Sequence, residues 1–588
     1  MSRDPAGRPE AAPEPLDTRV DRRGFLERMT ALTAAAAVAP GSLGAPARAA
    51  TGRTADAVVP TLPASPRAQA TDPAELTLVE AAYLIRTGEL SPLELVTACL
   101  DRIERWDGDY LAFNTVLPER ALDEARRLGR SRERSALRGV PLAIKDNYYT
   151  AGVPTTANSH IFRDFVPDFD ATAWARLRAA GAILIGKTQM GPLATTAATT
   201  PDGERTTVNA WAPFDASVSP GGSSSGSATA VAARLAPSST GTQTGGSITA
   251  PSISQGLTGI KPTMGRVSLH GIVPLTYTRD HPGPLARDAR DAALMLQVMA
   301  GPDPADPRSL GLPPVPDFVR ATEPRAPGDP RLRWRTTIGV LPDYLKGPDP
   351  APAGGPGDDD EAVGEEGQDQ VRRRAEAREG ARAAFERSQA EIAARRAMLS
   401  VFEDLGARVV DVELPRGWET LTSSDFNNVR LPERSEIFLE HLRDDVRNFG
   451  VSLSAWINGL LLPATEYVRG SRARLILLRA ILDDMLARCD VVAQTTPFPF
   501  DMVGLPLIAF PIGFESVSAA SPRPIGAMLG GLPYAEDRLL SVAAAYQRVT
   551  DWHRRRPADP DGFVRPSSGP EGSGRSRLDL FDVMEVGE

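Results

Sequence analysis

The chain has little cysteine and little histidine for its length. Only two cysteines, Cys99 and Cys489, occur in 588 residues, which excludes a disulfide scaffold and a four-thiolate metal site. The five histidines are scattered, with no HExxH or similar spacing, so a metal centre built from histidine is not expected. We therefore expect no metal cofactor.

Long apolar runs and an excess of positive charge are also missing. No stretch of about twenty strongly apolar residues occurs, so we expect no transmembrane anchor. Sixty-six basic residues face 75 acidic ones, for a net charge of −9, which gives a nucleic-acid backbone no electrostatic attraction to the chain. The hydrophobic content of 41% is close to the globular norm and allows a large core.

The amino terminus has the layout of an export signal. A charged segment with the pair Arg22-Arg23 precedes an Ala-rich apolar run, which ends at the triplet Ala47-Arg48-Ala49. This order predicts a signal peptide of the twin-arginine type over residues 1–49, and therefore a periplasmic or extracellular location. The alternative is an Ala-rich helix that follows a disordered arm. Residues 50–72 are polar and Pro/Ala-rich, and we interpret them as a linker.

Local patterns after residue 73 predict an α/β fold. Two capping boxes, Thr77 to Glu80 and Ser91 to Glu94, start amphipathic helices, so a helical N-terminal layer is expected. Apolar strands near 140–144 and 182–185 flank a helical pattern at 170–180, and this order favours parallel pairing. We expect a single domain over 73–557 with a large, mainly parallel central sheet covered by helices. Further predicted elements are a helix near 374–405 and strands at 409–412, 491–494 and 507–514.

Two polar segments are predicted to lie outside this core. Residues 346–371 are dominated by Pro, Gly, Asp and Glu, and so polar a segment cannot offset its ordering entropy by burial. We interpret it as a disordered surface insertion, with an acidic loop that binds a partner as the alternative. The Gly/Ser/Pro-rich residues 558–588 are expected to form a flexible tail.

The least ordinary stretch runs from Ser219 to Arg266 and is rich in Gly and small hydroxyl residues. A phosphate-binding loop is one interpretation, but the P-loop lysine is missing and no strand precedes the glycines. A nucleophile elbow is a second, since Gly222 to Gly226 matches G-x-S-x-G; that motif needs a strand running directly into the serine and a supported histidine later in the chain. A third uses a lysine as the base.

The third interpretation rests on three residues in a particular order. Lys145 ends the apolar run GVPLAIK, Ser223 lies in GGSSSGS, and Ser247 follows 24 residues later in TGGSI. Together with GIKPTMGRVS and GLPLIAFPIGF, these motifs resemble the amidase signature family, whose members carry a Ser, cis-Ser, Lys triad. The resemblance extends from about Leu76 to Pro557.

The resemblance implies a role for each motif residue. Ser247 would be the nucleophile, and a lysine kept neutral by its apolar surroundings, Lys145, would be the base. Ser223 would pass the proton between them. The backbone amides of Thr244, Gly245, Gly246 and Ser247 would form the oxyanion hole. The expected activity is hydrolysis of carboxylic amides, other than peptide bonds, through an acyl-enzyme and without an organic cofactor.

Three positions depart from the family pattern. Ser225 stands where Gly is common, Gln243 where Asp is common, and Thr249 where Arg is common, so detail around the triad cannot be carried over. The alternatives that remain are an esterase or peptide amidase with the same triad, and a non-catalytic binding subunit of the amidotransferase type. The expected partner is a small-molecule amide, with a homodimer as a further possibility and no nucleic acid.

Overall fold

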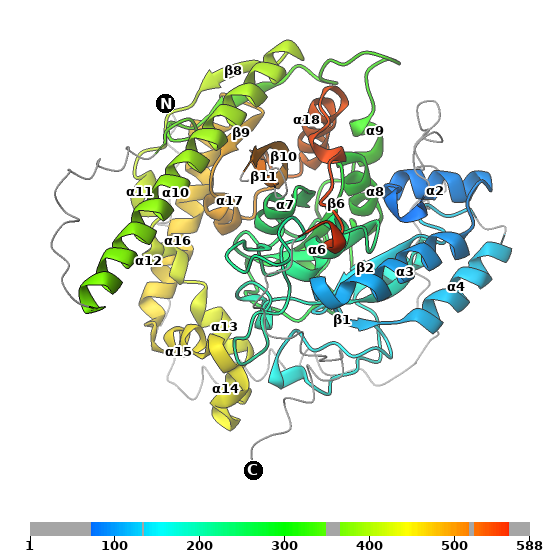
Figure 1. The fold of residues 1–588 in the computed structure, drawn as a ribbon. Coiled ribbons are helices and arrows are strands. Elements are labelled where there is room, and N and C mark those ends of the chain that lie inside the picture. The colour runs from blue at the N-terminus through cyan, green and yellow to red at the C-terminus, as the bar shows by residue number, and fades with distance from the viewer. Residues whose placement is uncertain (1–71, 132–133, 348–364, 517–521, 564–588) are drawn as a thin grey trace, which may run out of the picture. The chain divides into compact units, whose positions relative to one another are not determined.

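A computed structural model describes residues 72–131, 134–347, 365–516 and 522–563, all within one compact unit. Its centre is one sheet with the strand order β1-β3-β2-β4-β6-β5-β10-β11-β9-β7-β8 (Figure 1). The strands are β1 (Phe113–Val116), β2 (Pro141–Lys145), β3 (Ile183–Thr188), β4 (Ser238–Gln243), β5 (Thr258–Lys261), β6 (His281–Ala286), β7 (Thr337–Val340), β8 (Arg408–Asp411), β9 (Val491–Gln494), β10 (Leu507–Ser516) and β11 (Pro522–Gly531).

The sheet is mixed, which corrects the expectation of a mainly parallel one. Strand β2 pairs in parallel with β3 and β4, and β7 pairs in parallel with β8 and β9. The six other pairings in the described part of the chain are antiparallel. The strand-helix-strand order predicted the parallel pair β2 and β3 correctly. The antiparallel centre was missed because β4, β5 and β6 come from Gly/Ser-rich or short segments without a strand pattern.

Helices cover the sheet, as expected. They are α2 (Leu78–Thr87), α3 (Pro92–Tyr110), α4 (Pro118–Arg130), α5 (Thr172–Ala179), α6 (Ser225–Ala232), α7 (Thr249–Gln255), α8 (Ala289–Met299), α9 (Phe318–Thr322), α10 (Glu365–Asp404), α11 (Trp418–Leu421), α12 (Ser424–Asn428), α13 (Leu431–Ile437), α14 (Leu439–Asp444), α15 (Leu453–Leu461), α16 (Ala464–Ala480), α17 (Phe498–Val503) and α18 (Glu536–Val549). Helix α8 packs on β6, and both α10 and α18 pack on β10 and β11. Helix α6 packs on β4, and α7 also packs on β10 and β11.

The N-terminal helices form the predicted layer beside β2 and β3 (Figure 1). Both capping boxes are present: the Thr77 hydroxyl accepts the amide hydrogen of Glu80, and Ser91 does the same for Glu94. Each glutamate side chain in return accepts the amide hydrogen of its capping residue. These local hydrogen bonds satisfy amides that have no partner within the helix, so the start of each helix could be predicted from four residues.

Two predicted boundaries shift in the structure. Helix α10 begins at Glu365, so residues 365–371 belong to a helix and not to the disordered insertion. At the other end, Arg102 Nη2 lies 2.6 Å from Asp559 Oδ1, which ties residues of the expected tail to the core. The predicted signal peptide, all but the last residue of the linker, most of the insertion and residues 564–588 lie outside the described residues.

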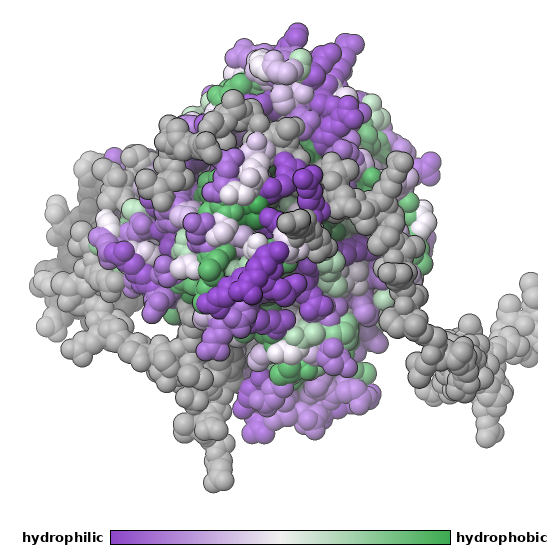
Figure 2. All heavy atoms as spheres, turned by 90° about the vertical axis from the view of Figure 1, so that its right-hand side faces the viewer, coloured by the Kyte–Doolittle hydropathy of each residue, from purple (hydrophilic) through white to green (hydrophobic). Residues whose placement is uncertain are grey.

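The surface mixes polar and apolar side chains. On the face drawn in Figure 2, hydrophilic residues alternate with smaller groups of hydrophobic ones. No helix in the described ranges is long and apolar enough to cross a membrane.

Candidate active site

Lys145 lies at the end of β2, a strand in which every residue is buried. Its Nζ is 2.9 Å from Ser223 Oγ, 2.9 Å from Ser224 Oγ and 2.8 Å from Thr242 Oγ1. Burial lowers the pKa of Lys145 to about 7, because a dry interior disfavours the ammonium form, and the charge of Asp280 opposes this shift only in part. Near neutral pH the amine is therefore neutral in a large fraction of molecules.

Two other lysines are fully buried, one on β3 and one on β5, and Lys145 differs from both. Lys187 Nζ lies 3.1 Å from Asp146 Oδ1, and Lys261 Nζ lies 3.6 Å from Asp501 Oδ1. Within the described residues, no carboxylate oxygen lies within 4.0 Å of Lys145 Nζ. A hydroxyl can donate to a neutral amine as well as accept from it, whereas a carboxylate favours the ammonium form. Of the three, Lys145 is the amine whose surroundings suit a base.

The turn that carries Ser223 is packed too tightly for side chains at its glycines. A Cβ added at Gly222 would lie 2.5 Å from Ala197 Cα, and one at Gly221, which has a φ of +75°, would lie 2.5 Å from Pro251 Cα. The Gly222-Ser223 peptide bond is cis, as the resemblance implies. Ser225, a departure from the family pattern, donates to the carbonyl of Gly221 at 2.6 Å. The hydroxyl therefore braces the turn that presents Ser223 to Lys145.

Ser247 lies in the turn between β4 and α7, and its exposed fraction is 9%. Close packing of Gly221 on Pro251 brings the Ser223 turn next to the start of α7, which follows Ser247 in the chain. No other described residue forms a hydrogen bond with the Ser247 hydroxyl. The structure thus joins Lys145 and Ser223 by a direct hydrogen bond, whereas the place of Ser247 in the triad stays a prediction.

The expected oxyanion hole loses one donor. The amide of Gly246 donates to Asp501 Oδ2 at 2.9 Å, so it is not free to bind a substrate oxygen, contrary to the expectation. The amides of Thr244, Gly245 and Ser247 form no hydrogen bond with any other described residue. Asp501 comes from α17, 255 residues further along the chain, and nothing in the sequence pairs it with the TGGS segment. Three amides remain as candidate donors.

Gln243, one of the departures from the family pattern, links this segment to Asp501. Its Oε1 accepts the amides of Ile248 and Thr249, both at 2.9 Å. Its Nε2 donates to both oxygens of Asp501, at 2.9 and 3.1 Å. A carboxylate at position 243 would face a second carboxylate here, so the neutral amide of glutamine fits the site.

Asp280, just before β6, binds Thr244 at the start of the same segment. Its Oδ1 accepts a short hydrogen bond from the Thr244 hydroxyl, and its oxygens also accept the amides of Leu275 and Thr276. Burial raises the pKa of both Asp280 and Asp501, the latter to about 6. Ser224, Thr242, Asp280 and Asp501 were missed by sequence reasoning. Ser224 and Thr242 adjoin the predicted motifs and Asp280 begins the stretch DHPGPLARD, which also resembles the family, but Asp501 carries no such signal.

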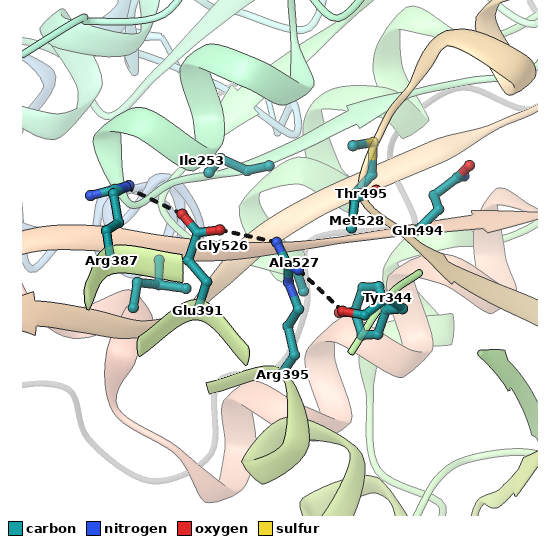
Figure 3. A pocket seen from close by; sticks show the side chains of 11 residues that line it. Ile253, Tyr344, Arg387, Glu391, Arg395, Gln494, Thr495, Gly526, Ala527 and Met528 are labelled. Atoms are coloured by element: carbon teal, nitrogen blue, oxygen red, sulfur yellow. Dashed lines mark hydrogen bonds and ion pairs between the residues drawn. The ribbon is translucent and has the colours of Figure 1, made fainter. Parts of the chain in front are cut away.

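A separate cavity of about 190 Å³ lies between α7, α10, β11 and the end of β9. Its charged side chains are paired with one another, since Glu391 binds both Arg387 and Arg395 (Figure 3). Arg395 also donates to the carbonyl of Tyr344. None of Lys145, Ser223 and Ser247 lines this cavity.

Comparisons with known proteins show which family the chain resembles in sequence and fold. The family model described as Amidase matches residues 94–341. Two curated relatives are glutamyl-tRNA(Gln) amidotransferase subunits A: one from Chromohalobacter salexigens is 33% identical, covering 82% of this chain and 98% of its own, and one from Chloroflexus aggregans is 34% identical with the same coverage. This chain belongs to the amidase signature family. Among solved structures, the native peptide amidase from Stenotrophomonas maltophilia matches with a TM-score of 0.65 and 28% identity, over 84% of this chain and 99% of that one.

Glutamate at position 243 tests the role of the neutral amide. Gln243→Glu keeps an acceptor for Ile248 and Thr249 but turns the donor toward Asp501 into a carboxylate. We expect the free energy of unfolding to fall by about 3 kcal/mol at pH 8, because two buried carboxylates repel each other. The loss should shrink toward pH 5, since the folded protein holds a proton on one of the pair. Urea denaturation at both pH values measures this.

The exposed Gln389 of α10 provides the matched control, and Gln389→Glu should leave stability nearly unchanged at both pH values. An equal loss for Gln243→Glu at pH 5 and pH 8 would contradict the repulsion argument.

Proposed function

We propose that the protein hydrolyses the C–N bond of carboxylic amides to a carboxylate and an amine or ammonia. The observation that carries the proposal is the contact of 2.9 Å between the buried Lys145 amine and the Ser223 hydroxyl, where no carboxylate of the described residues pairs with the amine. A serine hydroxyl is a weak nucleophile at neutral pH and needs such a base. A serine nucleophile with a lysine base requires no metal or organic cofactor.

The first half of the proposed reaction forms an acyl-enzyme. Ser247 Oγ attacks the amide carbon while its proton passes to Ser223 Oγ, whose own proton moves to Lys145 Nζ. The oxyanion that forms is held by the free amides of Thr244, Gly245 and Ser247. When the C–N bond breaks, the proton returns through Ser223 to the leaving nitrogen.

Water completes the reaction by the same route. It attacks the Ser247 ester while giving a proton to the Ser223 and Lys145 pair, and collapse of the second intermediate restores the Ser247 hydroxyl. The acyl-enzyme no longer contains the leaving group, so its hydrolysis is the same whether the substrate was an amide or an ester. Ester substrates and peptide amides are therefore compatible with this mechanism. The similarity to the peptide amidase supports that second candidate.

A non-catalytic subunit is the remaining alternative, supported by the similarity to amidotransferase subunits A. It requires no reactive serine, so labelling of Ser247 separates it from an enzyme. The expected homodimer stays a prediction.

Replacing Ser247 tests the nucleophile. We expect Ser247→Ala to lower the turnover of aryl and aliphatic amides by about a thousandfold or more, and to abolish labelling by a fluorophosphonate. Ammonia release and intact mass spectrometry measure the two effects. The exposed Ser217 is the control, and Ser217→Ala should react like the wild type. Full turnover by Ser247→Ala would refute the assignment.

The lysine base predicts an acid limb in the pH profile. Lys145 acts only when neutral and its pKa lies at about 7, so kcat/KM should fall about tenfold for each pH unit below that value. Lys145→Ala should be about as damaging as loss of Ser247. The profile is measured between pH 5 and 9 at constant ionic strength, and a flat profile down to pH 5 would exclude this role.

We also propose that the protein is exported by the twin-arginine route. Arg22→Lys together with Arg23→Lys should keep the protein in the cytoplasm of its host, because the paired arginines are the part that the export receptor recognises. Cell fractionation with immunoblotting measures the location, and Arg3→Lys with Arg8→Lys is the control. Unchanged export of the Arg22 and Arg23 variant would argue against this route.

A further inference from the structure

The cavity drawn in Figure 3 lies where strands β7 and β9 end. These two strands are parallel, and the chain leaves them at Val340 and Gln494. Strand β11 extends past that point: its residues 528–531 pair with β9, whereas Gly526 and Ala527 line the cavity. In open α/β sheets, ligands bind outside the carboxyl ends of parallel strands. The cavity therefore lies at a place where this kind of sheet binds small molecules.

Two buried polar side chains line this cavity without a partner. Gln494 is 2% exposed and Tyr344 is 1% exposed. Both Oε1 and Nε2 of Gln494, and the hydroxyl of Tyr344, form no hydrogen bond within the described residues. Burying an amide or a hydroxyl without a hydrogen bond is unfavourable. A molecule that pairs with these groups would recover the bonds that the described residues leave unmade.

The charged groups around the cavity, in contrast, are already paired. Glu391 Oε1 lies 3.2 Å from Arg387 Nε, and Glu391 Oε2 lies 3.1 Å from Arg395 Nη2. Arg387 Nη1 lies 2.6 Å from Glu515 Oε2. An ion in the cavity would therefore lose its hydration without meeting an unpaired charge among these groups. Burial raises the pKa of Tyr344, which keeps its hydroxyl protonated and uncharged. An uncharged molecule fits this wall.

The rest of the wall offers apolar contact. Ile253 of α7, together with Ile525 and Met528 of β11, lines the cavity. The cavity volume of about 190 Å³ is far larger than the about 15 Å³ that a single water molecule needs. There is thus room for a polar group at Gln494 and for a short hydrocarbon part against the three apolar side chains.

A primary amide is the complement of the Gln494 side chain. It places an oxygen acceptor beside two N–H donors, so it can accept from Nε2 and donate to Oε1 at the same time. We infer that the cavity is a binding site for a small uncharged amide with a short alkyl group. The inference goes beyond the proposed function and does not depend on it, because none of Lys145, Ser223 and Ser247 lines the cavity.

A cysteine in the cavity wall tests binding at this place. Thr495 lines the cavity and is exposed, whereas the native Cys99 and Cys489 are buried. Thr495→Cys is made together with Ser247→Ala, so that no amide is consumed, and is alkylated with N-ethylmaleimide. Butyramide should slow this alkylation about tenfold once its concentration reaches about ten times Kd. Peptide mass spectrometry measures the rate.

A neighbouring cysteine and two related molecules are the controls. Thr496→Cys is matched, because Thr496 is exposed but does not line the cavity, and butyramide should not change its rate. N,N-Dimethylbutyramide lacks the N–H donors and butyrate is charged, so each should need an about tenfold higher concentration or more for equal protection. No protection of Thr495→Cys by butyramide, or equal protection by either related molecule, would overturn the inference.

Replacing Gln494 assigns the binding to the unpartnered amide. Gln494→Leu should abolish the protection of Thr495→Cys by butyramide. Without butyramide it should raise the urea midpoint of unfolding, because an apolar group of similar size replaces a buried amide that has no partner. Gln389→Leu, at an exposed position of α10, is the control and should leave the midpoint nearly unchanged. Protection that survives Gln494→Leu, or a midpoint that Gln494→Leu lowers, would overturn the inference.

The cavity site and the proposed function can fail separately. Protection that depends on Gln494 supports the cavity site even if the wild type hydrolyses no amide. Amide hydrolysis by the wild type, without any protection of Thr495→Cys, overturns the cavity site and leaves the proposed function standing.

Discussion

The burial of one lysine amine among hydroxyl groups is the constraint on which the site depends. An ammonium ion moved from water into a protein interior loses several kcal/mol of solvation, and at Lys145 the charge of Asp280 offsets that loss only in part. The fold therefore favours the neutral amine. The neutral amine is enclosed by β2, a strand whose residues are all buried, and it is hydrogen-bonded to hydroxyls from two other segments. Any change that admits water or a negative charge would restore the ammonium form.

Two buried carboxylates position the segment that follows β4. Asp280 holds the Thr244 hydroxyl, and Asp501 holds the Gly246 amide and the Gln243 side chain. Because Asp280 binds Thr244 and Asp501 binds Gln243 and Gly246, the two carboxylates fix the path of the TGGS turn. The amides of Thr244, Gly245 and Ser247 form no hydrogen bond with any described residue. Lys261 Nζ lies 3.6 Å from Asp501 Oδ1. The counter-charge of Asp501 is therefore Lys261 and not Lys145.

Sequence reasoning succeeded where the decisive interactions are local. The capping boxes at Thr77 and Ser91 involve residues three apart, and the burial of Lys145 follows from the apolar residues just before it. The antiparallel centre of the sheet was missed because β4, β5 and β6 lack a strand pattern and because β10 reaches β5 from a distant part of the chain. The bond from Gly246 to Asp501 spans 255 residues, and no local pattern encodes it. Helix α10 began earlier than expected because its first turns are as polar as the segment before them.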